Sequence, residues 1–143
     1  REYFALEIPD NRQHDSYLNL PLDEMMLHIQ KAIENGHPVC WEGDISEEGF
    51  IHAKDNYVDI SKNERPVTPT SRQEEFEQLR TTDDHVMEII GTFLKDEQRY
   101  YVCRNSAGKK WGNQGLIYLS EDYLRLKTIA VFMSEEAFLF DRK

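Results

Sequence analysis

The sequence predicts an α+β fold in which a long helix comes first and an antiparallel sheet forms the C-terminal half. Three observations carry this prediction. Apolar residues recur at helical spacing between positions 22 and 33, and short apolar runs separated by turn residues follow after position 85. No internal repeat or low-complexity tract interrupts them. Helices followed by a run of strands are typical of an α+β arrangement.

The N-terminal part begins with a predicted strand over residues 3–8, which the turn cluster at 9–11 ends. A helix follows, because its apolar residues lie at offsets 0, 3, 4, 7 and 11 and so share one face: Leu22, Met25, Met26, Ile29 and Ile33. Pro21 suits its first turn and Gly36 its exit. Residues 38–41 then read as a buried strand.

The middle of the chain, residues 46–70, is mostly polar and contains two prolines. We therefore expect a long surface loop there, with at most short strands near 50–52 and 57–60. A short helix over residues 71–79 should follow, because Ser71 and the Glu three residues later have capping-box spacing.

The C-terminal half contains four predicted strands, at residues 86–90, 99–104, 116–119 and 128–133. Residues 95–98 form a turn, so the first two strands should pair as an antiparallel hairpin. This hairpin would bring His85 and Asn105 to the same end, because their separation of 20 residues (105 − 85) equals roughly two strands plus a turn. A single capped turn is expected at 120–124.

Composition limits the classes of partner. With 143 residues the chain is about one domain's worth, and 17 basic against 27 acidic residues give a formal net charge of -10. Such a charge repels phosphate backbones and anionic lipid, so we expect no nucleic acid and no membrane as partners. No apolar run approaches membrane-spanning length. The two cysteines are too few and too far apart for a zinc site or a disulfide scaffold.

His85 and Asn105 are the residues that carry chemistry. A neutral imidazole can take a proton from a thiol or hydroxyl and return it to a leaving amine when a third group fixes its tautomer and ring plane. The side-chain carbonyl of Asn105 can do this, and an oriented His–Asn pair favours cysteine chemistry over a serine triad with Asp. The alternative is structural, because a His at a strand start and an Asn at a strand end often serve only the fold.

The motifs around these two residues resemble the His and Asn regions of papain-like cysteine peptidases. His85 lies in Asp-His-x-Met with a glycine six residues after the His. Asn105 begins Asn-Ser-x-Gly-x-x-Trp-Gly-x-x-Gly, which fixes six identities in eleven positions. Further matching segments, at 7–11, 19–24, 41–50 and 81–85, resemble the C-terminal half of the bleomycin hydrolase or aminopeptidase C branch. The resemblance covers nearly the whole chain and implies that residues 1–143 form one unit, the C-terminal antiparallel sheet part of a papain-like peptidase domain.

The resemblance implies a role for each matching residue. His85 would be the general base and acid and Asn105 its orienting partner, while Trp111 would pack beside the pair and the backbone of Asp84 would border the substrate cleft. The nucleophilic Cys, and a Gln of the oxyanion hole, belong to the preceding part of that fold and would come before Arg1. We therefore expect thiol-dependent, aminopeptidase-like peptide hydrolysis only with this Cys-bearing N-terminal part, and a chain that is inactive alone.

Neither cysteine of this chain fits the nucleophile. The papain-type cysteine opens a long helix after a Gly-Ser-containing turn and has Gln six residues before it, whereas Cys40 follows Pro38-Val39 on a predicted strand and position 34 is Glu. Cys40 and Cys103 are better explained as core residues. One departure from the family pattern is Ala107, which stands where a second Trp usually shields the His–Asn hydrogen bond from water.

Other functions remain open from the sequence. The runner-up is a non-catalytic, peptidase-derived module that binds peptide or a partner subunit. No cofactor and no metal are implied: the remaining histidines lack metal-ligand spacing, and the acids between 42 and 48 read as solvated rather than as a cation site. The expected partners are a peptide substrate and the Cys-bearing part of the same peptidase. A homo-oligomer is compatible with the sequence, and so are both a cytoplasmic and an exported soluble protein, since any signal would precede Arg1.

Overall fold

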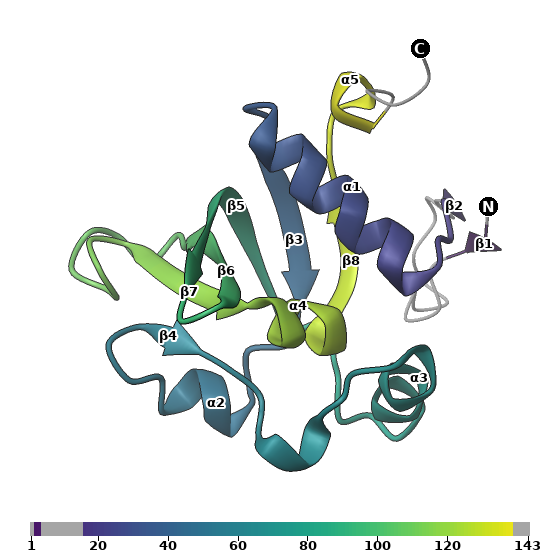
Figure 1. Ribbon diagram of the computed structural model, residues 1–143, viewed down its shortest axis with the longest axis horizontal. Helices are drawn as coiled ribbons and strands as arrows, with labels where there is room; N and C mark the ends of the chain where they lie inside the picture. Colours follow the sequence, from purple (N-terminus) through teal and green to yellow (C-terminus); the bar gives the residue numbers. More distant parts are fainter. Residues whose placement is uncertain (1, 4–15, 139–143) are drawn as a thin grey trace, which may run out of the picture.

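The computed structural model describes residues 2–3 and 16–138 and has the predicted α+β architecture (Figure 1). A six-stranded sheet runs in the order β4-β7-β6-β5-β3-β8. Its strands are β3 (Val39–Gly43), β4 (Tyr57–Val58), β5 (His85–Lys95), β6 (Gln98–Arg104), β7 (Leu116–Ser120) and β8 (Thr128–Phe132). Two further short strands, β1 (Glu2–Tyr3) and β2 (Ser16–Tyr17), pair with each other. The strand predicted at 3–8 otherwise lies outside the described residues.

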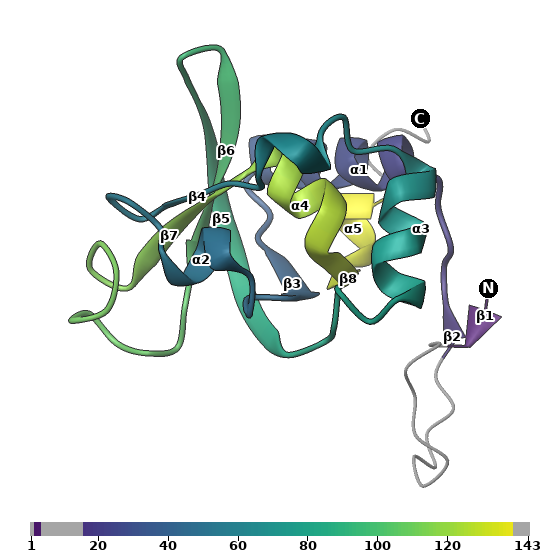
Figure 2. The ribbon, with the colours of Figure 1, turned by 90° about the horizontal axis from the view of Figure 1, so that it is seen from below.

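Helices cover one face of the sheet. The long helix α1 (Leu22–Glu34) and the short helix α4 (Glu121–Lys127) lie on the same side of β3 (Figure 2). Between them and the sheet lies the core, which contains Ile29 of α1, Leu124 of α4 and the fully buried Trp41 of β3. The predicted helix of the N-terminal part is therefore confirmed, and its regular apolar face is what packs on the sheet.

The predicted hairpin is also confirmed, although it is longer than the apolar pattern indicated. β5 does not end at Gly91 but continues to Lys95, because a register shift between Ile89 and Gly91 lets the strand pass a bulge and keep pairing with β6. The turn is made by Asp96 and Glu97, both at positive φ. This is the twist that a two-residue hairpin loop requires.

The middle of the chain departs from the prediction in two places. The short strand allowed near 50–52 is absent, because the helical turn α2 (Glu48–Ile51) occupies this region, while the strand expected near 57–60 is present as β4 (Tyr57–Val58). The next helix, α3 (Pro69–Glu77), begins earlier than Ser71. Thr68 is its N-cap and pairs reciprocally with Ser71, so Pro69 occupies the first turn and Ser71 is inside the helix.

The C-terminal strands form a meander only as far as β7. The expected single turn at 120–124 is the two-turn helix α4, capped by Ser120, and α4 carries the chain across to the opposite edge, where β8 pairs antiparallel with β3. A last helical turn, α5 (Glu135–Phe138), packs against α1. The structure also contains the 3-10 turn η1 (Lys62–Glu64). Within residues 2–3 and 16–138, no helix is both long and apolar enough to cross a bilayer.

Candidate active site

His85 and Asn105 meet at one end of the sheet. His85 opens β5 and Asn105 directly follows β6, and the hairpin places the His85 Nε2 atom 2.9 Å from the Asn105 Oδ1 atom. Both residues are half-buried. The antiparallel register puts them there: Glu88 pairs with Arg104, so the residues before one and after the other converge.

The hydrogen bonds around Asn105 fix the tautomer of His85. The Ser106 backbone N–H donates to Asn105 Oδ1 at 2.7 Å, which identifies that atom as the carbonyl oxygen of the amide. An oxygen only accepts, so the Nε2 atom of neutral His85 must carry the proton and donate it to Asn105. The Nδ1 atom of His85 is then an unprotonated base, and it has no hydrogen-bond partner among the described residues.

The loop after Asn105 is held by its own backbone. The Asn105 N–H donates to the Gly115 carbonyl at 3.0 Å, and the Gly115 N–H donates to the Trp111 carbonyl at 2.7 Å. Gly112, at a φ of 57°, has no room for a Cβ because the Leu116 carbonyl oxygen lies against it. The glycines of the motif therefore serve the tight path of this loop.

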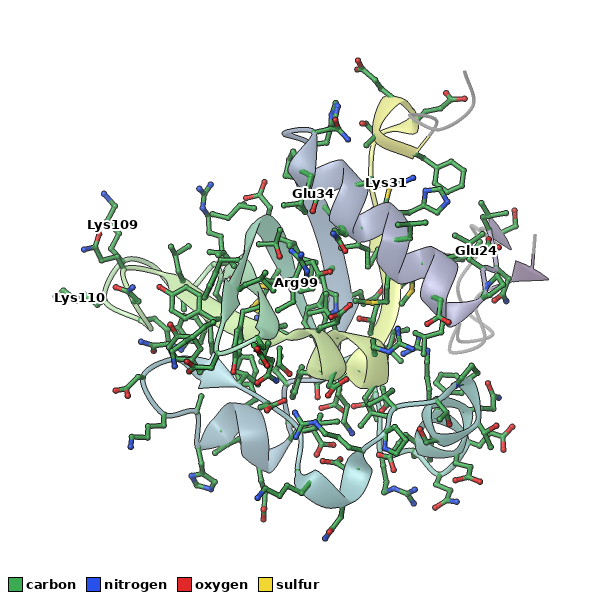
Figure 3. The ribbon with its side chains drawn as sticks, in the orientation of Figure 1. Glu24, Lys31, Glu34, Arg99, Lys109 and Lys110 are labelled. Carbon is green, nitrogen blue, oxygen red and sulfur yellow. The ribbon has the colours of Figure 1, made fainter. Side chains whose placement is uncertain are left out.

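Trp111 packs away from the loop tip. Its ring stacks on Phe50 of the α2 turn with centroids 6.3 Å apart, and it lies against the core. Lys109 and Lys110 project outward from the far end of this loop (Figure 3). Ala107 is exposed, so position 107 supplies no bulky side chain to cover the His85–Asn105 hydrogen bond.

Gly43 stands beside His85 on the neighbouring strand. It pairs directly with His85 across β3 and β5, and with Thr128 of β8 on its other side. A Cβ at Gly43 would collide with the Trp41 ring and the Lys127 carbonyl oxygen. The space beside Gly43 is already filled by these two groups, so the position requires glycine.

Two polar segments flank His85, and a buried carboxylate joins them. Asp44, which follows β3 and is 1% exposed, accepts hydrogen bonds from Ser46 and from Thr82. Burial alone would raise the pKa of Asp44, but these hydrogen bonds outweigh burial and lower the pKa. Asp84, predicted only as a cleft-bordering residue, accepts a hydrogen bond from the Ile45 N–H at 2.9 Å.

Both cysteines lie on strands, as predicted, but only Cys103 belongs to the core, so the prediction of a core position was wrong for Cys40. Cys103 is fully buried, and this burial raises the pKa of its thiol. Cys40 is half-buried on the sheet face opposite the helices, and burial, followed by the charges of Glu42 and Glu88, raises its thiol pKa. Both environments disfavour the thiolate that would attack a peptide bond.

The other candidates do not assemble around the pair. His28 stacks on Phe138 and His52 is exposed, while His14 lies outside the described residues. Of the loop acids, Glu47 accepts a hydrogen bond from the buried Lys127. Residues 2–3 and 16–138 contain no group of three His, Cys, Asp or Glu side chains that could hold a metal ion.

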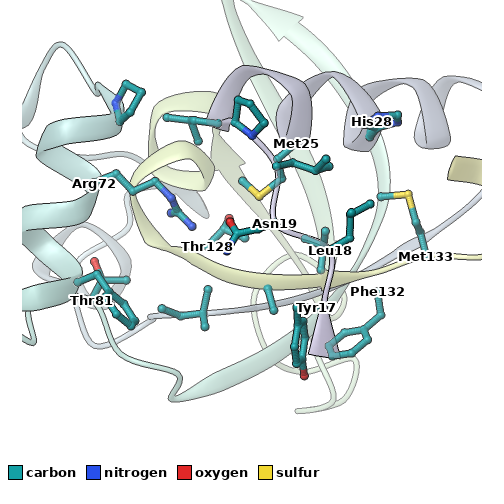
Figure 4. A pocket seen from close by; sticks show the side chains of 18 of the residues that line it. Tyr17, Leu18, Asn19, Met25, His28, Arg72, Thr81, Thr128, Phe132 and Met133 are labelled. Atoms are coloured by element: carbon teal, nitrogen blue, oxygen red, sulfur yellow. The ribbon is translucent and has the colours of Figure 1, made fainter. Parts of the chain in front are cut away.

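A separate hollow of about 1140 Å³ lies between α1, α3 and β8 (Figure 4). Arg72 extends from α3 into it and donates to the Arg125 and Leu126 carbonyls at the end of α4. Burial, followed by the charge of Arg125, lowers the pKa of Arg72 to about 10. Neither His85 nor Asn105 lines this hollow, so it is distinct from the candidate site.

Sequence reasoning missed the residues that hold the two flanking segments. Asp44 was expected among the solvated acids between positions 42 and 48, but the fold buries it, and Gly43 and Thr82 were given no role of their own. The available signal was weak: an acid directly after one strand and a Thr-Thr pair just before another. Nothing in their spacing shows that the two segments meet.

The fold is similar to those of two solved structures. The PepW crystal structure from Lactobacillus rhamnosis HN001 is similar to this chain with a TM-score of 0.67 at 21% identity, covering 84% of this chain and 28% of PepW. A structure from a study of the mite allergens Blo t 1 and Der p 1 is similar with a TM-score of 0.50 at 18% identity, covering 74% of this chain and 30% of the allergen chain. This chain thus spans less than a third of either relative. No curated protein sequence gives a significant match.

The fold, together with a His–Asn pair at the end of its sheet, defines a papain-like peptidase relative. A family model settles the family, because the Peptidase C1-like family matches residues 4–139. The chain belongs to the Peptidase C1-like family.

Proposed function

We propose that this chain is the C-terminal, histidine-bearing part of a cysteine peptidase of the bleomycin hydrolase or aminopeptidase C kind. The observation that carries the proposal is the 2.9 Å contact between His85 Nε2 and Asn105 Oδ1, which leaves Nδ1 as a free base. The resemblance of the motifs and the membership of the Peptidase C1-like family support the same reading.

His85 would handle every proton of the reaction. Its Nδ1 atom takes the proton of a cysteine thiol supplied by the N-terminal part, and the thiolate attacks the peptide carbonyl carbon. The imidazolium then gives that proton to the leaving amine as the C–N bond breaks, which leaves a thioester. Water attacks the thioester while Nδ1 takes one of its protons, and the proton returns to the thiolate when the acid product leaves.

Asn105 would keep the imidazole in the productive state throughout. By accepting from Nε2–H, its carbonyl oxygen holds the ring plane and stabilises the imidazolium that forms beside the thiolate. The thiols of Cys40 and Cys103 take no part, since both have raised pKa values and Cys103 has no access to solvent.

The test is to supply the missing part. The 143-residue chain alone should hydrolyse no aminopeptidase substrate, and the complete polypeptide, with the Cys-bearing part, should do so in a thiol-dependent way. In that polypeptide, His85→Ala should abolish hydrolysis and Asn105→Ala should lower kcat/KM about 100-fold. His52→Ala is the matched control, because His52 is exposed and lies outside the site. Full activity of His85→Ala would refute the proposal.

The exposed Ala107 favours a second candidate, a peptide-binding module without catalysis. A hydrogen bond open to water holds the imidazole less firmly, which suits a site where hydrolysis has been lost. The complete polypeptide would then bind peptides but release no amine, and a Gln six residues before a Cys-Trp pair would be missing from its N-terminal part.

A further inference from the structure

Asp44 is the most heavily hydrogen-bonded carboxylate near His85. Its Oδ1 atom accepts from the Ser46 N–H and hydroxyl, both at 2.8 Å. Its Oδ2 atom accepts from the Thr82 N–H at 2.8 Å and the Thr82 hydroxyl at 3.1 Å. Each oxygen thus serves a different segment, one after β3 and one before β5. Only an ionised carboxylate can accept all four bonds, which is why its pKa is lowered in spite of burial.

The two segments are also joined in the other direction. The Ile45 N–H donates to Asp84 Oδ1 at 2.9 Å, so an acid of each segment accepts from the backbone of the other. We call residues 44–46 with 82–84 the loop clamp. These bonds stand in for the ladder that ends at His85 and Gly43, where regular strand pairing between β5 and β3 stops.

Asp44 is itself anchored to the helix side of the protein. Its N–H donates to the Lys127 carbonyl at 3.1 Å, and its own carbonyl accepts from the buried Tyr123 hydroxyl at 2.7 Å. The loop clamp is therefore tied to α4 rather than free to move with the surface. Lys127 in turn holds Glu47 and Glu75, at 2.7 and 3.2 Å.

The loop clamp lies next to the histidine on both sides. Only two residues, Asp83 and Asp84, separate Thr82 from His85, and Asp44 directly follows Gly43, the strand partner of His85. Within the described part of the chain, Asp44 forms no hydrogen bond with the imidazole ring, so its effect must pass through the backbone at which β5 begins. A half-exposed ring held by one hydrogen bond to Asn105 depends on that backbone staying in register.

We propose that Asp44 is a positioning residue: its carboxylate, through the loop clamp, holds the start of β5 so that the His85 ring stays hydrogen-bonded to Asn105. This inference deepens the proposed function and rests on it for its catalytic meaning. The structural half of the inference stands on this chain alone, since the hydrogen bonds of the loop clamp all lie within it.

The test measures the His85 Nε2 proton by NMR in the 143-residue chain. Exchange of that proton with water reports how often the bond to Asn105 opens. In Asp44→Ala the exchange should speed up about tenfold, the factor that loss of roughly one hydrogen bond's stabilisation gives. Asp44→Asn should show a smaller increase, because an amide presents one oxygen and must turn its NH₂ toward one of the two donor segments.

Asp59→Ala is the matched control. Asp59 also accepts from several groups, including Arg65, Ser120 and Gln98, but these lie by the opposite end of β6. This variant should lose stability without changing exchange at His85. If Asp44→Ala does not fold, Thr82→Val replaces it, because this near-isosteric change removes one clamp bond and should still speed exchange.

Two results would overturn the inference: unchanged exchange in a folded Asp44 or Thr82 variant, or equal acceleration in Asp59→Ala, which would reveal a general loss of stability. In the complete polypeptide, Asp44→Asn should lower kcat with little change in KM. These outcomes are separable from failure of the proposed function. A polypeptide without peptidase activity would refute the catalytic role while leaving the proton exchange to decide the loop clamp.

Discussion

The two ends of the β5–β6 hairpin are held together by different means. At the turn end, Phe93 stacks on Tyr100 with centroids 5.7 Å apart, Tyr57 meets Tyr100 edge-on at 5.0 Å, and the Lys95 ammonium lies 4.4 Å from the centre of the Tyr57 ring. At the other end, His85 and Asn105 are held by hydrogen bonds. Aromatic packing suits an end that needs only stability. At the histidine end, a directional hydrogen bond holds the ring at Nε2 and leaves Nδ1 without a hydrogen-bond partner among the described residues.

The largest effect is expected from a substitution that pushes the strands apart at the histidine end. Gly43→Ala should destabilise the protein by about 3 kcal/mol or prevent folding, because its methyl group would enter the Trp41 ring and the Lys127 carbonyl oxygen. Gly36→Ala is the control: it has positive φ but open space around it, and should cost about 1 kcal/mol. Denaturant unfolding measures both, and similar costs would show that the crowding at Gly43 is unimportant.

The turn end should respond to loss of apolar surface instead. Phe93 is half-buried among the aromatic rings, so Phe93→Ala should lower the free energy of unfolding by about 1.5 kcal/mol. The neighbouring Leu94 is 65% exposed, and Leu94→Ala should change it by less than about 0.5 kcal/mol. His85 proton exchange should stay at the wild-type rate in both variants. A clear change in that rate would mean that the two ends are not independent.

Acid should weaken both ends through their carboxylates. Asp44 and Asp59 have folded-state pKa values below the ordinary 3.8. Burial opposes the ionisation of both carboxyl groups, but the hydrogen bonds that they accept outweigh burial. The donors are Ser46 and Thr82 at Asp44, and Arg65 foremost at Asp59. A carboxyl group whose pKa is lowered by folding stabilises the protein at pH values above its unfolded-state pKa. That stabilisation is lost as the pH falls through its folded-state pKa. Unfolding curves should therefore show stability declining below about pH 4. Asp44→Asn and Asp59→Asn should each flatten the decline, and an unchanged slope would contradict the assignment.

The smallest expected effect is at the exposed Ala107. Ala107→Trp should change stability by no more than about 0.5 kcal/mol, but an indole lying over the His85–Asn105 bond should slow exchange of the His85 proton. Lys109→Trp, on the outward part of the same loop, is the control and should leave that exchange unaltered. Equal effects of the two variants would show that shielding at position 107 is not what sets the rate.

The sequence predicted best where one physical pattern dominates. The regular apolar face of α1 and the turn between β5 and β6 are local features, so helix, hairpin and the meeting of His85 with Asn105 followed from spacing. The start of α3 was misplaced because Thr68 and Ser71 cap reciprocally, and the Ser-x-x-Glu pattern competed with a better cap three residues earlier. A strand expected near residues 50–52 is the α2 turn, in which Gly49 packs against the Asp59 carbonyl.

What could not be predicted are the contacts between segments far apart in the chain. Asp44 and Thr82 are 38 positions apart, and Lys127 lies 80 positions from Glu47. No local signal links such residues, because the folded sheet brings them together and their own spacing carries no period. The position of β8 beside β3, which the chain reaches through α4, could not be predicted either. Any antiparallel order of the strands would satisfy the apolar pattern.

The surroundings of the two cysteines have a practical consequence for measuring the amount of reactive nucleophile. Both thiol pKa values are raised, so the thiolate form is disfavoured at Cys40 and at Cys103. In a complete polypeptide, a limiting amount of a thiolate-selective alkylating reagent would then react with any low-pKa cysteine of the other part. Cys40 and Cys103 would consume little of the reagent. Stoichiometric titration of the complete polypeptide would thereby report its fraction of competent nucleophile directly, without removal of either native cysteine.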